Sequence, residues 1–179
     1  NLFKIPTVID PKNENFSIYK NSTLVTPNQL EASKISNINI ISNYDTEKCG
    51  KMIMKKYNIK NVLVTRGDKG LSLISKKSSL HSPTISKEVY DVSGAGDTVL
   101  AVIASCLPNK IEDTKVLTLA NKAAGKVIAK IGTSPISLQD LFDSDLKTNN
   151  NKVFDIKTLC KKLDQDRKKG LKIGFTNGC

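Results

Sequence analysis

Several residue types are scarce in this chain of 179 residues, and their scarcity excludes classes of protein. There is no tryptophan, aromatic residues make up 5% of the sequence, and His81 is the single histidine. One histidine cannot build a histidine-rich metal centre, so we interpret His81 as a surface residue near the end of a strand. The few aromatic side chains also argue against a surface that stacks on nucleic-acid bases.

Closely spaced cysteine pairs are absent as well. Zinc sites and redox-active disulfides commonly use C-x-x-C pairs, and this chain has none. One of the cysteines lies inside an apolar run, where a structural thiol is expected. We therefore expect reduced thiols of a cytosolic protein, with neither a disulfide framework nor a zinc site. The four cysteines are Cys49, Cys106, Cys160 and Cys179.

Long apolar segments are missing too. No stretch approaches the roughly 18 apolar residues that suggest a membrane span, and the first residues lack the pattern of a signal peptide. Hydrophobic residues make up 39% and charged residues 25% of the chain, as in soluble globular proteins. We expect a cytoplasmic protein with one buried core and part of a second domain. Because the chain begins at Asn1 and stops at Cys179, directly after an apolar segment, we expect it to be a fragment of a longer protein.

The formal net charge of +11 suggests an anionic partner such as nucleic acid. Nearly all of the positive charge comes from lysines spread along the chain, because Arg66 and Arg167 are the only arginines. Basic and aromatic residues do not alternate as they do in proteins that bind single strands. We therefore predict no nucleic-acid partner and no membrane partner, and interpret the lysines as a compositional bias.

Strand-like and helix-like segments alternate from residue 6 to residue 130. Short β-branched or apolar runs between turn residues predict strands, and apolar residues spaced by three and four predict helices. Asp45 is the expected N-cap of the second helix. The alternation predicts an α/β domain with helices over a largely parallel sheet. The expected strands span residues 6–10, 24–26, 61–65 and 71–74, and the expected helices span 28–35, 45–57, 98–107 and 112–130.

A polar segment separates this domain from the last residues. Asp143 to Lys152 contains three consecutive asparagines and no periodicity, so we interpret it as a linker. Asp155 then caps a basic amphipathic helix, which we expect to pack against a strand at residues 171–176; a helix on a membrane surface is the alternative. The chain ends at residues 177–179, where a nucleotide-binding fold has its strand-to-helix phosphate loop.

Residues 91–97, with the sequence D-V-S-G-A-G-D, are the most informative motif. Gly94, Ala95 and Gly96 leave backbone N–H groups open at the start of an apolar helix, which we expect to be buried. Orphan donors and the helix dipole at such a start bind phosphate. Asp97 is an acceptor that can take a proton from a hydroxyl while the amides hold the phosphoryl group. The structural alternative is an N-cap aspartate after a tight glycine turn.

Three further motifs each have a structural alternative. Asn28 and Glu31 can form a capping box at a helix start. Residues 65–70 follow a strand, and their glycines suit an ordinary hairpin turn or a close approach of the backbone to a ligand. Lys12, in the Asp-Pro-Lys that follows the first strand, either meets a phosphate or belongs to a solvated turn, which we favour.

The motif at 91–97 resembles the second signature of the ribokinase-type (phosphofructokinase-B-type) sugar kinases. The wider string from Glu88 to Val99 is similar to one branch of that family, the bifunctional heptose-7-phosphate kinase / heptose-1-phosphate adenylyltransferases. Ser93 stands where that branch usually has threonine. The P-N-x-x-E element at 27–31, the loop at 65–70 and the Asp-Pro-Lys at 10–12 match the same branch in the same order.

The resemblance implies a set of site residues. Asp97 would be the catalytic base, and the amides of Gly94, Ala95 and Gly96 would form the anion hole. Glu31 would lie at a hydrated Mg²⁺. This hard cation keeps several of its water ligands, so a carboxylate can contact it through one of these waters. Asn121 would lie on the helix beside the adenine. The implied ATP-binding residues are Asn28, Gln29, Leu30, Glu31, Thr65, Gly67, Gly70 and Asn121.

The resemblance also implies the fold and the domains. Residues 1–137 would be the C-terminal, nucleotide-binding half of a ribokinase-like layered α/β domain, with a linker at 138–152. Residues 153–179 would start a Rossmann-like nucleotidyltransferase domain, because residues 174–179 are similar to the first strand of cytidylyltransferase-like proteins.

The implied function is that of a bacterial cytoplasmic enzyme. Using ATP and Mg²⁺, it would phosphorylate heptose 7-phosphate at the anomeric hydroxyl. The longer parent, expected to be a homodimer, would also convert heptose 1-phosphate to ADP-heptose for lipopolysaccharide. The alternatives are a kinase of the same fold for another sugar, and a nucleotide-binding module that is inactive as a fragment.

Overall fold

A computed structural model describes residues 5–13, 15–85, 93–109, 111–129, 135–137, 139–141 and 156–174. The chain divides into two compact units, residues 1–141 and 142–179. This division falls inside the segment 138–152 that the sequence predicts as a linker. In the described ranges no helix has both the length and the apolar character needed to cross a membrane.

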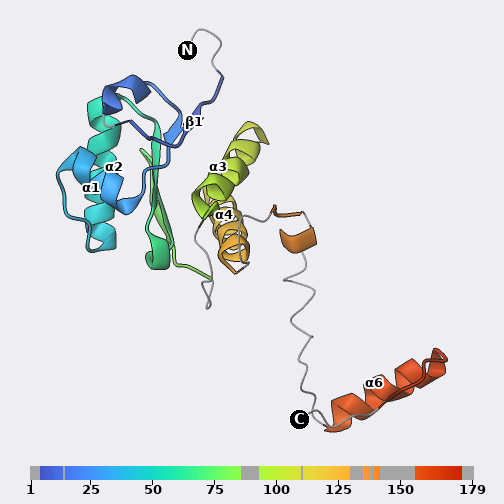
Figure 1. Cartoon of the computed structure of the whole chain (residues 1–179). Helices are drawn as coiled ribbons and strands as arrows, with labels where there is room; N and C mark the ends of the chain where they lie inside the picture. The colour runs from blue at the N-terminus through green and yellow to red at the C-terminus, as the bar shows by residue number, and fades with distance from the viewer. Residues whose placement is uncertain are drawn as a thin grey trace. The chain divides into compact units, whose positions relative to one another are not determined.

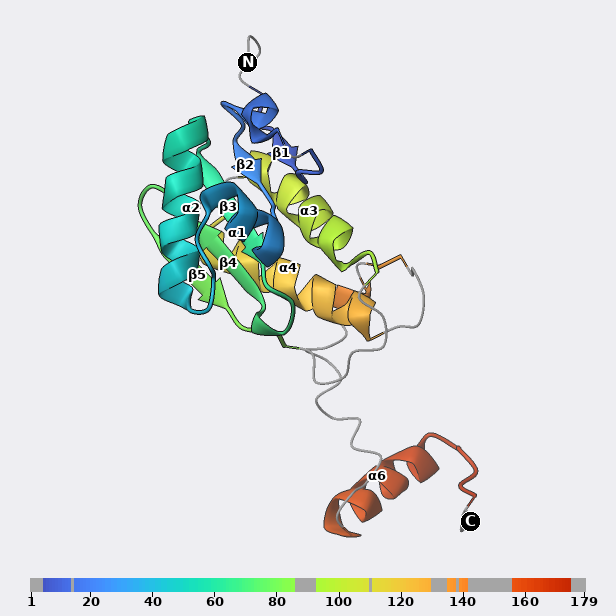
Figure 2. The ribbon, with the colours of Figure 1, turned by 60° about the vertical axis from the view of Figure 1, so that its left-hand side comes forward.

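The first unit, shown in Figure 1, is built on a five-stranded sheet with the order β1-β2-β3-β4-β5, and the strands are labelled in Figure 2. β1, β2 and β3 pair in parallel, whereas β3, β4 and β5 pair antiparallel. The sheet is therefore mixed, and the prediction of a largely parallel sheet is wrong for its second half. The turns after β3 and β4 are too short for a crossover, so both strands return as hairpins. The strands are β1 (Val8–Ile9), β2 (Leu24–Val25), β3 (Asn61–Thr65), β4 (Leu71–Ile74) and β5 (Ser79–Ser82).

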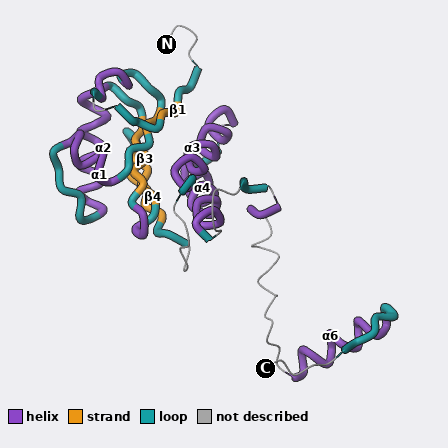
Figure 3. Tube along the Cα trace, in the orientation of Figure 1, coloured by secondary structure: helices purple, strands orange, loops and turns teal. Residues whose placement is uncertain are grey.

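Helices cover both faces of this sheet, as Figures 1 and 3 show. α1 (Gln29–Ser36) and α2 (Asn43–Tyr57) lie on one face, and α3 (Ala95–Cys106) and α4 (Asp113–Ile128) lie on the other. The same layers can be followed in the turned view of Figure 2. Short 3₁₀ turns complete the unit at η1 (Phe16–Tyr19), η2 (Gly67–Lys69) and η3 (Leu107–Asn109).

The central strand β3 links two hydrophobic cores. Val62 and Val64 belong to the core under α1 and α2, whereas Leu63 belongs to the core under α3 and α4. All three side chains are fully buried. Successive side chains of a strand point to opposite faces, so a continuous apolar strand fills both cores at once.

Three element-level predictions need correction. Ser42, rather than Asp45, is the N-cap of α2, and Asp45 closes the capping box from the third helical position. α3 is buried along one face only, through Val99, Ile103 and Cys106, because only that face packs on the sheet and α4. β5 was missed because Ser79–Ser82 has a polar sequence, and it places His81 inside a strand, where its side chain is 19% exposed.

The second unit contains α6 (Ile156–Lys168), with Gly170 just after it at a positive φ of 78°. The expected helix is thus present. Residues 171–174 are not in a strand, which corrects that part of the expected strand at 171–176. The remainder of that strand and the loop at 177–179 lie outside the described residues.

Candidate functional site

The carboxyl ends of the three parallel strands meet at one edge of the sheet. Asp10 follows β1, Thr26 follows β2 and Thr65 ends β3. In open α/β sheets ligands bind outside the carboxyl ends of the strands, because connecting loops and helix N-termini converge there. A pocket of about 120 Å³ opens at this edge. It is lined by Asp10, Lys12, Thr26, Asn28, Glu31, Thr65 and Gly96.

A capping box fixes the first helix beside this pocket. The Asn28 side chain accepts a hydrogen bond from the Glu31 N–H at 2.9 Å, and Glu31 Oε2 accepts one from the Asn28 N–H at 2.7 Å. Both residues also line the pocket. The structural and functional interpretations of this motif are therefore compatible, because the box holds two polar side chains at the pocket wall.

Lys12 brings positive charge to the same pocket. Its Nζ lies 2.9 Å from Asp10 Oδ2. The hydrogen bond and charge of Asp10 raise the pKa of the Lys12 ammonium, and the charges of Glu31 and Asp97 act in the same direction. The charges of three carboxylates from different segments thus act on one cation, and Asp10 is the one in direct contact with it.

The motif at 91–97 contributes the start of α3. Gly94 is the N-cap, with a positive φ of 79°, and no side chain caps the helix. A Cβ added at Gly96 would meet nothing within 4 Å, so the backbone there faces open space at the pocket. Asp97 is exposed in the first turn. Asp91 and Val92 lie outside the described residues.

The loop after β3 is anchored by a buried arginine. Arg66 is 7% exposed, and its guanidinium donates to Asn43 Oδ1 at 2.8 Å and to the Lys69 carbonyl at 3.3 Å. Burial lowers the pKa of this guanidinium. Gly70, with a φ of 79°, closes the loop. These contacts fix the backbone beyond Thr65, although Gly67 and Gly70 do not line the pocket.

Three further predicted ATP-binding residues, in addition to Gly67 and Gly70, are not among those that line this pocket. The Gln29 side chain donates to the Ile40 carbonyl at 2.9 Å, and Leu30 is 75% exposed. Asn121 is 3% exposed, and its amide donates to Ser82 Oγ at 2.7 Å and to the Pro83 carbonyl. Asn121 thereby ties α4 to the end of β5. Roles for these three residues in nucleotide binding stay predictions.

Asp10, Lys12 and Thr26 line the pocket although the sequence analysis assigned none of them to the site. The signal for Asp10 and Thr26 was an acidic or hydroxyl residue directly after a short strand, and Lys12 was the lysine of the Asp-Pro-Lys motif. That signal becomes informative only when the strands are known to be parallel neighbours, because only then do their ends share an edge.

The donors at this edge are oxygen atoms, which suit Mg²⁺ held through water. Asp10 and Glu31 supply carboxylates, and Thr26 and Thr65 supply hydroxyls. Within the described ranges no group of three or more histidine, cysteine or acidic residues could hold a metal ion by itself. Cys49 is fully buried, and burial raises the pKa of its thiol, as expected for a structural cysteine.

Comparisons with known proteins show the family to which the chain is similar. A profile of the pfkB family carbohydrate kinases matches residues 4–140. The bifunctional protein HldE of Pelobacter propionicus is 38% identical over 184 residues, covering 98% of this chain and 37% of that protein. The HldE protein of Campylobacter concisus is 39% identical over 180 residues, covering 98% of this chain and 38% of that protein. The chain therefore spans little more than a third of the length of the curated relatives it matches.

Solved structures show the same fold. Phosphofructokinase-2 from Escherichia coli, in a complex with potassium, superposes with a TM-score of 0.70 at 22% identity, covering 78% of this chain and 46% of that chain. Ribokinase from Thermotoga maritima gives a TM-score of 0.66 at 25% identity, covering 81% of this chain and 50% of that chain. The predicted ribokinase-like α/β fold is confirmed for the first unit.

Proposed function

The chain belongs to the pfkB family of carbohydrate kinases, and from that membership we propose that it forms the nucleotide-binding part of a heptose 7-phosphate kinase. The observation that carries the proposal is the pocket at the carboxyl ends of β1, β2 and β3. Of the described residues in the motif at 91–97, only Gly96, at the start of α3, lines it, together with the cation Lys12 and several oxygen donors. This combination suits the transfer of a phosphoryl group, which requires positioning, charge stabilisation and one oriented base.

In the proposed reaction Asp97 takes the proton from the anomeric hydroxyl of the sugar. The hydroxyl oxygen forms a bond to the γ-phosphorus of ATP as the bond to the β-phosphate oxygen breaks, and ADP leaves. The amides of Gly94, Ala95 and Gly96 stabilise charge on the transferred group, because they lie at the positive end of α3. Mg²⁺, held near Glu31 through water, would neutralise charge on the ATP phosphates.

The choice of heptose 7-phosphate rests on the relatives named bifunctional protein HldE. Their similarity covers 98% of this chain, whereas the pfkB profile ends at residue 140. The residues after 141 therefore share in the similarity to the bifunctional proteins. We infer that the longer protein is a cytoplasmic homodimer that also transfers the AMP group of ATP to heptose 1-phosphate, giving ADP-heptose and releasing pyrophosphate.

The test is the variant Asp97→Asn in the full-length protein. Removal of the base should slow phosphorylation of heptose 7-phosphate by about 10²–10⁴-fold, as is usual for general-base residues. ATP affinity should change little, because the amide keeps the size of the side chain. Asp164→Asn on the exposed face of α6 is the matched control and should leave kinase turnover intact.

Near-normal turnover of Asp97→Asn would show that Asp97 is not the catalytic base. Wild-type protein that phosphorylates another sugar faster than heptose 7-phosphate would instead support a kinase of the same fold with a different substrate. Absence of any kinase activity in the full-length protein would support a nucleotide-binding module without turnover.

A further inference from the structure

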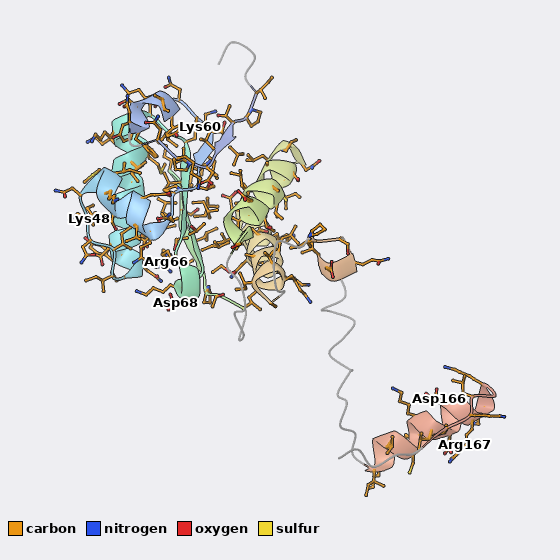
Figure 4. All side chains as sticks on the ribbon, in the orientation of Figure 1. Lys48, Lys60, Arg66, Asp68, Asp166 and Arg167 are labelled. Atoms are coloured by element: carbon orange, nitrogen blue, oxygen red, sulfur yellow. The ribbon has the colours of Figure 1, made fainter. Side chains whose placement is uncertain are left out.

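A second hollow, which we call the basic hollow, lies at the other end of β3. Its volume is about 820 Å³, and it is formed by the end of α2, the start of β3 and the turn between β4 and β5. In Figure 4 Lys60, directly before β3, and Arg66, directly after it, mark the two ends of the strand. The basic hollow shares no lining residue with the pocket at the candidate functional site.

Five lysines dominate the charge of the basic hollow. All five are exposed, and Asp113 is the one acidic residue among the described residues that line it. Lys51 has an ion pair, with Glu47 at 3.6 Å. Like charges gathered around a concave surface create a positive potential that attracts anions. The five are Lys51, Lys55, Lys60, Lys76 and Lys77.

The chemistry of these side chains is compatible with a phosphate group. The lysine ammonium is a compact point charge that binds phosphate oxygens without the bidentate geometry of arginine. No aromatic residue lines the basic hollow among the described residues, so it offers no platform for nucleobases. Asn58 and Ser78 add neutral hydrogen-bond donors to the wall.

An apolar pocket adjoins the basic hollow. Its volume is about 150 Å³, and Asn61 and Asp113 line both spaces. Leu73, Ile103 and Leu117 are among the side chains that surround it. An apolar cavity of about this size can hold a group as large as benzene.

We propose that the basic hollow and the adjoining apolar pocket together bind a small phosphate ester. The phosphate lies among the lysines, and a ring or short hydrocarbon arm of the ligand enters the apolar pocket. This site is separate from the proposed ATP site and uses none of its residues. Its existence is therefore independent of the kinase assignment.

Calorimetric titration of the full-length protein tests the proposal, with phenyl phosphate and inorganic phosphate as probes. Phenyl phosphate should bind more tightly than inorganic phosphate, because its ring leaves water. Lys76→Glu/Lys77→Glu should weaken phenyl phosphate binding by about tenfold or more, since charge-assisted hydrogen bonds are lost. The control Lys157→Glu/Lys161→Glu makes the same change of charge on α6 and should alter affinity by less than about twofold.

A second variant examines the apolar pocket. Ile111 lines it and is 42% exposed, so Ile111→Ser should leave the fold intact. This variant should weaken binding of phenyl phosphate and leave binding of inorganic phosphate unchanged.

Several results would overturn the proposal. They are equal losses in the two charge-reversed variants, unchanged affinity in Lys76→Glu/Lys77→Glu, and loss of inorganic phosphate binding in Ile111→Ser. Retention of the wild-type protein on phosphatidylglycerol vesicles without binding of phenyl phosphate would assign the lysines to a lipid surface instead.

Discussion

At the scale of single residues, Glu31 combines a structural bond with a place at the pocket wall. Glutamine at this position still reaches the backbone N–H of Asn28. The free energy of unfolding of Glu31→Gln should therefore lie within about 0.5 kcal/mol of the wild-type value. The variant should need several-fold more Mg²⁺ for half-maximal kinase activity, because a metal-bound water prefers a full carboxylate charge. Kinase assays over a Mg²⁺ series, with urea unfolding of the same samples, check both statements.

Asp45 provides the matched control, because it occupies the same position of the capping box at the start of α2. Asp45→Asn should lower stability modestly and leave the Mg²⁺ dependence unchanged. If Glu31→Gln behaves in the same way, Glu31 has a structural role only.

Glu47 and His81 couple stability to pH. The hydrogen bond with His81, at 3.3 Å, lowers the pKa of the Glu47 carboxyl, and the charge of Lys51 acts in the same direction. A carboxyl with a lowered pKa stabilises the fold at pH values above its unfolded pKa of about 4.3. That stabilisation is lost as the pH falls through the lower pKa of the folded state.

The stability difference between the wild type and Glu47→Gln should therefore be larger at pH 6 than at pH 3. Urea unfolding at the two pH values measures it. If the stability difference between the wild type and Glu47→Gln is the same at both pH values, the charge of the Glu47 carboxylate contributes nothing to stability. In the folded protein, an imidazole protonated on Nε2 satisfies both contacts of His81, since Ser72 Oγ–H then donates to Nδ1 at 2.8 Å.

At the scale of elements, Gly70 determines how β3 returns as β4. Its φ is 79°, and an added Cβ would collide with backbone atoms of Ser82 and Thr84. Gly70→Ala should therefore destabilise the fold by about 3 kcal/mol or more, because strained φ and steric overlap add. Gly67 also has a positive φ, but its Cβ would meet nothing within 4 Å. Gly67→Ala should cost only about 1 kcal/mol.

Urea unfolding with a constant m-value measures both changes. Equal effects of the two substitutions would contradict the steric argument.

Elements with strong periodicity or clear caps were predictable. The helix expected at 112–130 is α4, with Glu112 as its N-cap. Prediction from sequence was less successful where two neighbouring residues could each cap a helix, and where a strand forms only by pairing with its neighbour. Ser42 and Asp45 both suit an N-cap, and the backbone conformation that selects Ser42 depends on the preceding chain. The polar strand β5 has no sequence signal, because it forms by pairing with β4.

At the scale of the whole molecule, the division near residue 141 predicts that two activities can be separated. The sequence from Asp143 to Lys152 has almost no apolar residues, and lengthening a loop costs only about 0.6 kcal/mol for each doubling of its length. A Gly/Ser insertion beside Asn150 in the full-length protein should leave kinase and adenylyltransferase rates nearly unchanged. Separate assays with the two sugar substrates check this. Loss of either activity would show that the boundary is misplaced.

The sequence by itself determined the family, the order of most elements and the motifs at 27–31, 65–70 and 91–97. These features are local, since glycine turns, caps and apolar periodicity each depend on a few neighbouring residues. The turn at 65–70 already indicated that β4 returns beside β3, whereas the antiparallel strand β5 was missed because its sequence is polar.

Only the tertiary structure added Asp10, Lys12 and Thr26 to the pocket that the predicted residues Asn28, Glu31, Thr65 and Gly96 line. Lys12, Thr65 and Gly96 are far apart in sequence, yet the carboxyl ends of parallel strands and the start of α3 bring them to one pocket. It also set Asn121 against Ser82 and gathered the dispersed lysines around the basic hollow. The physical reason is the same in each case. The free energy of burying the two cores fixes how the layers pack, and that packing determines which distant polar groups become neighbours.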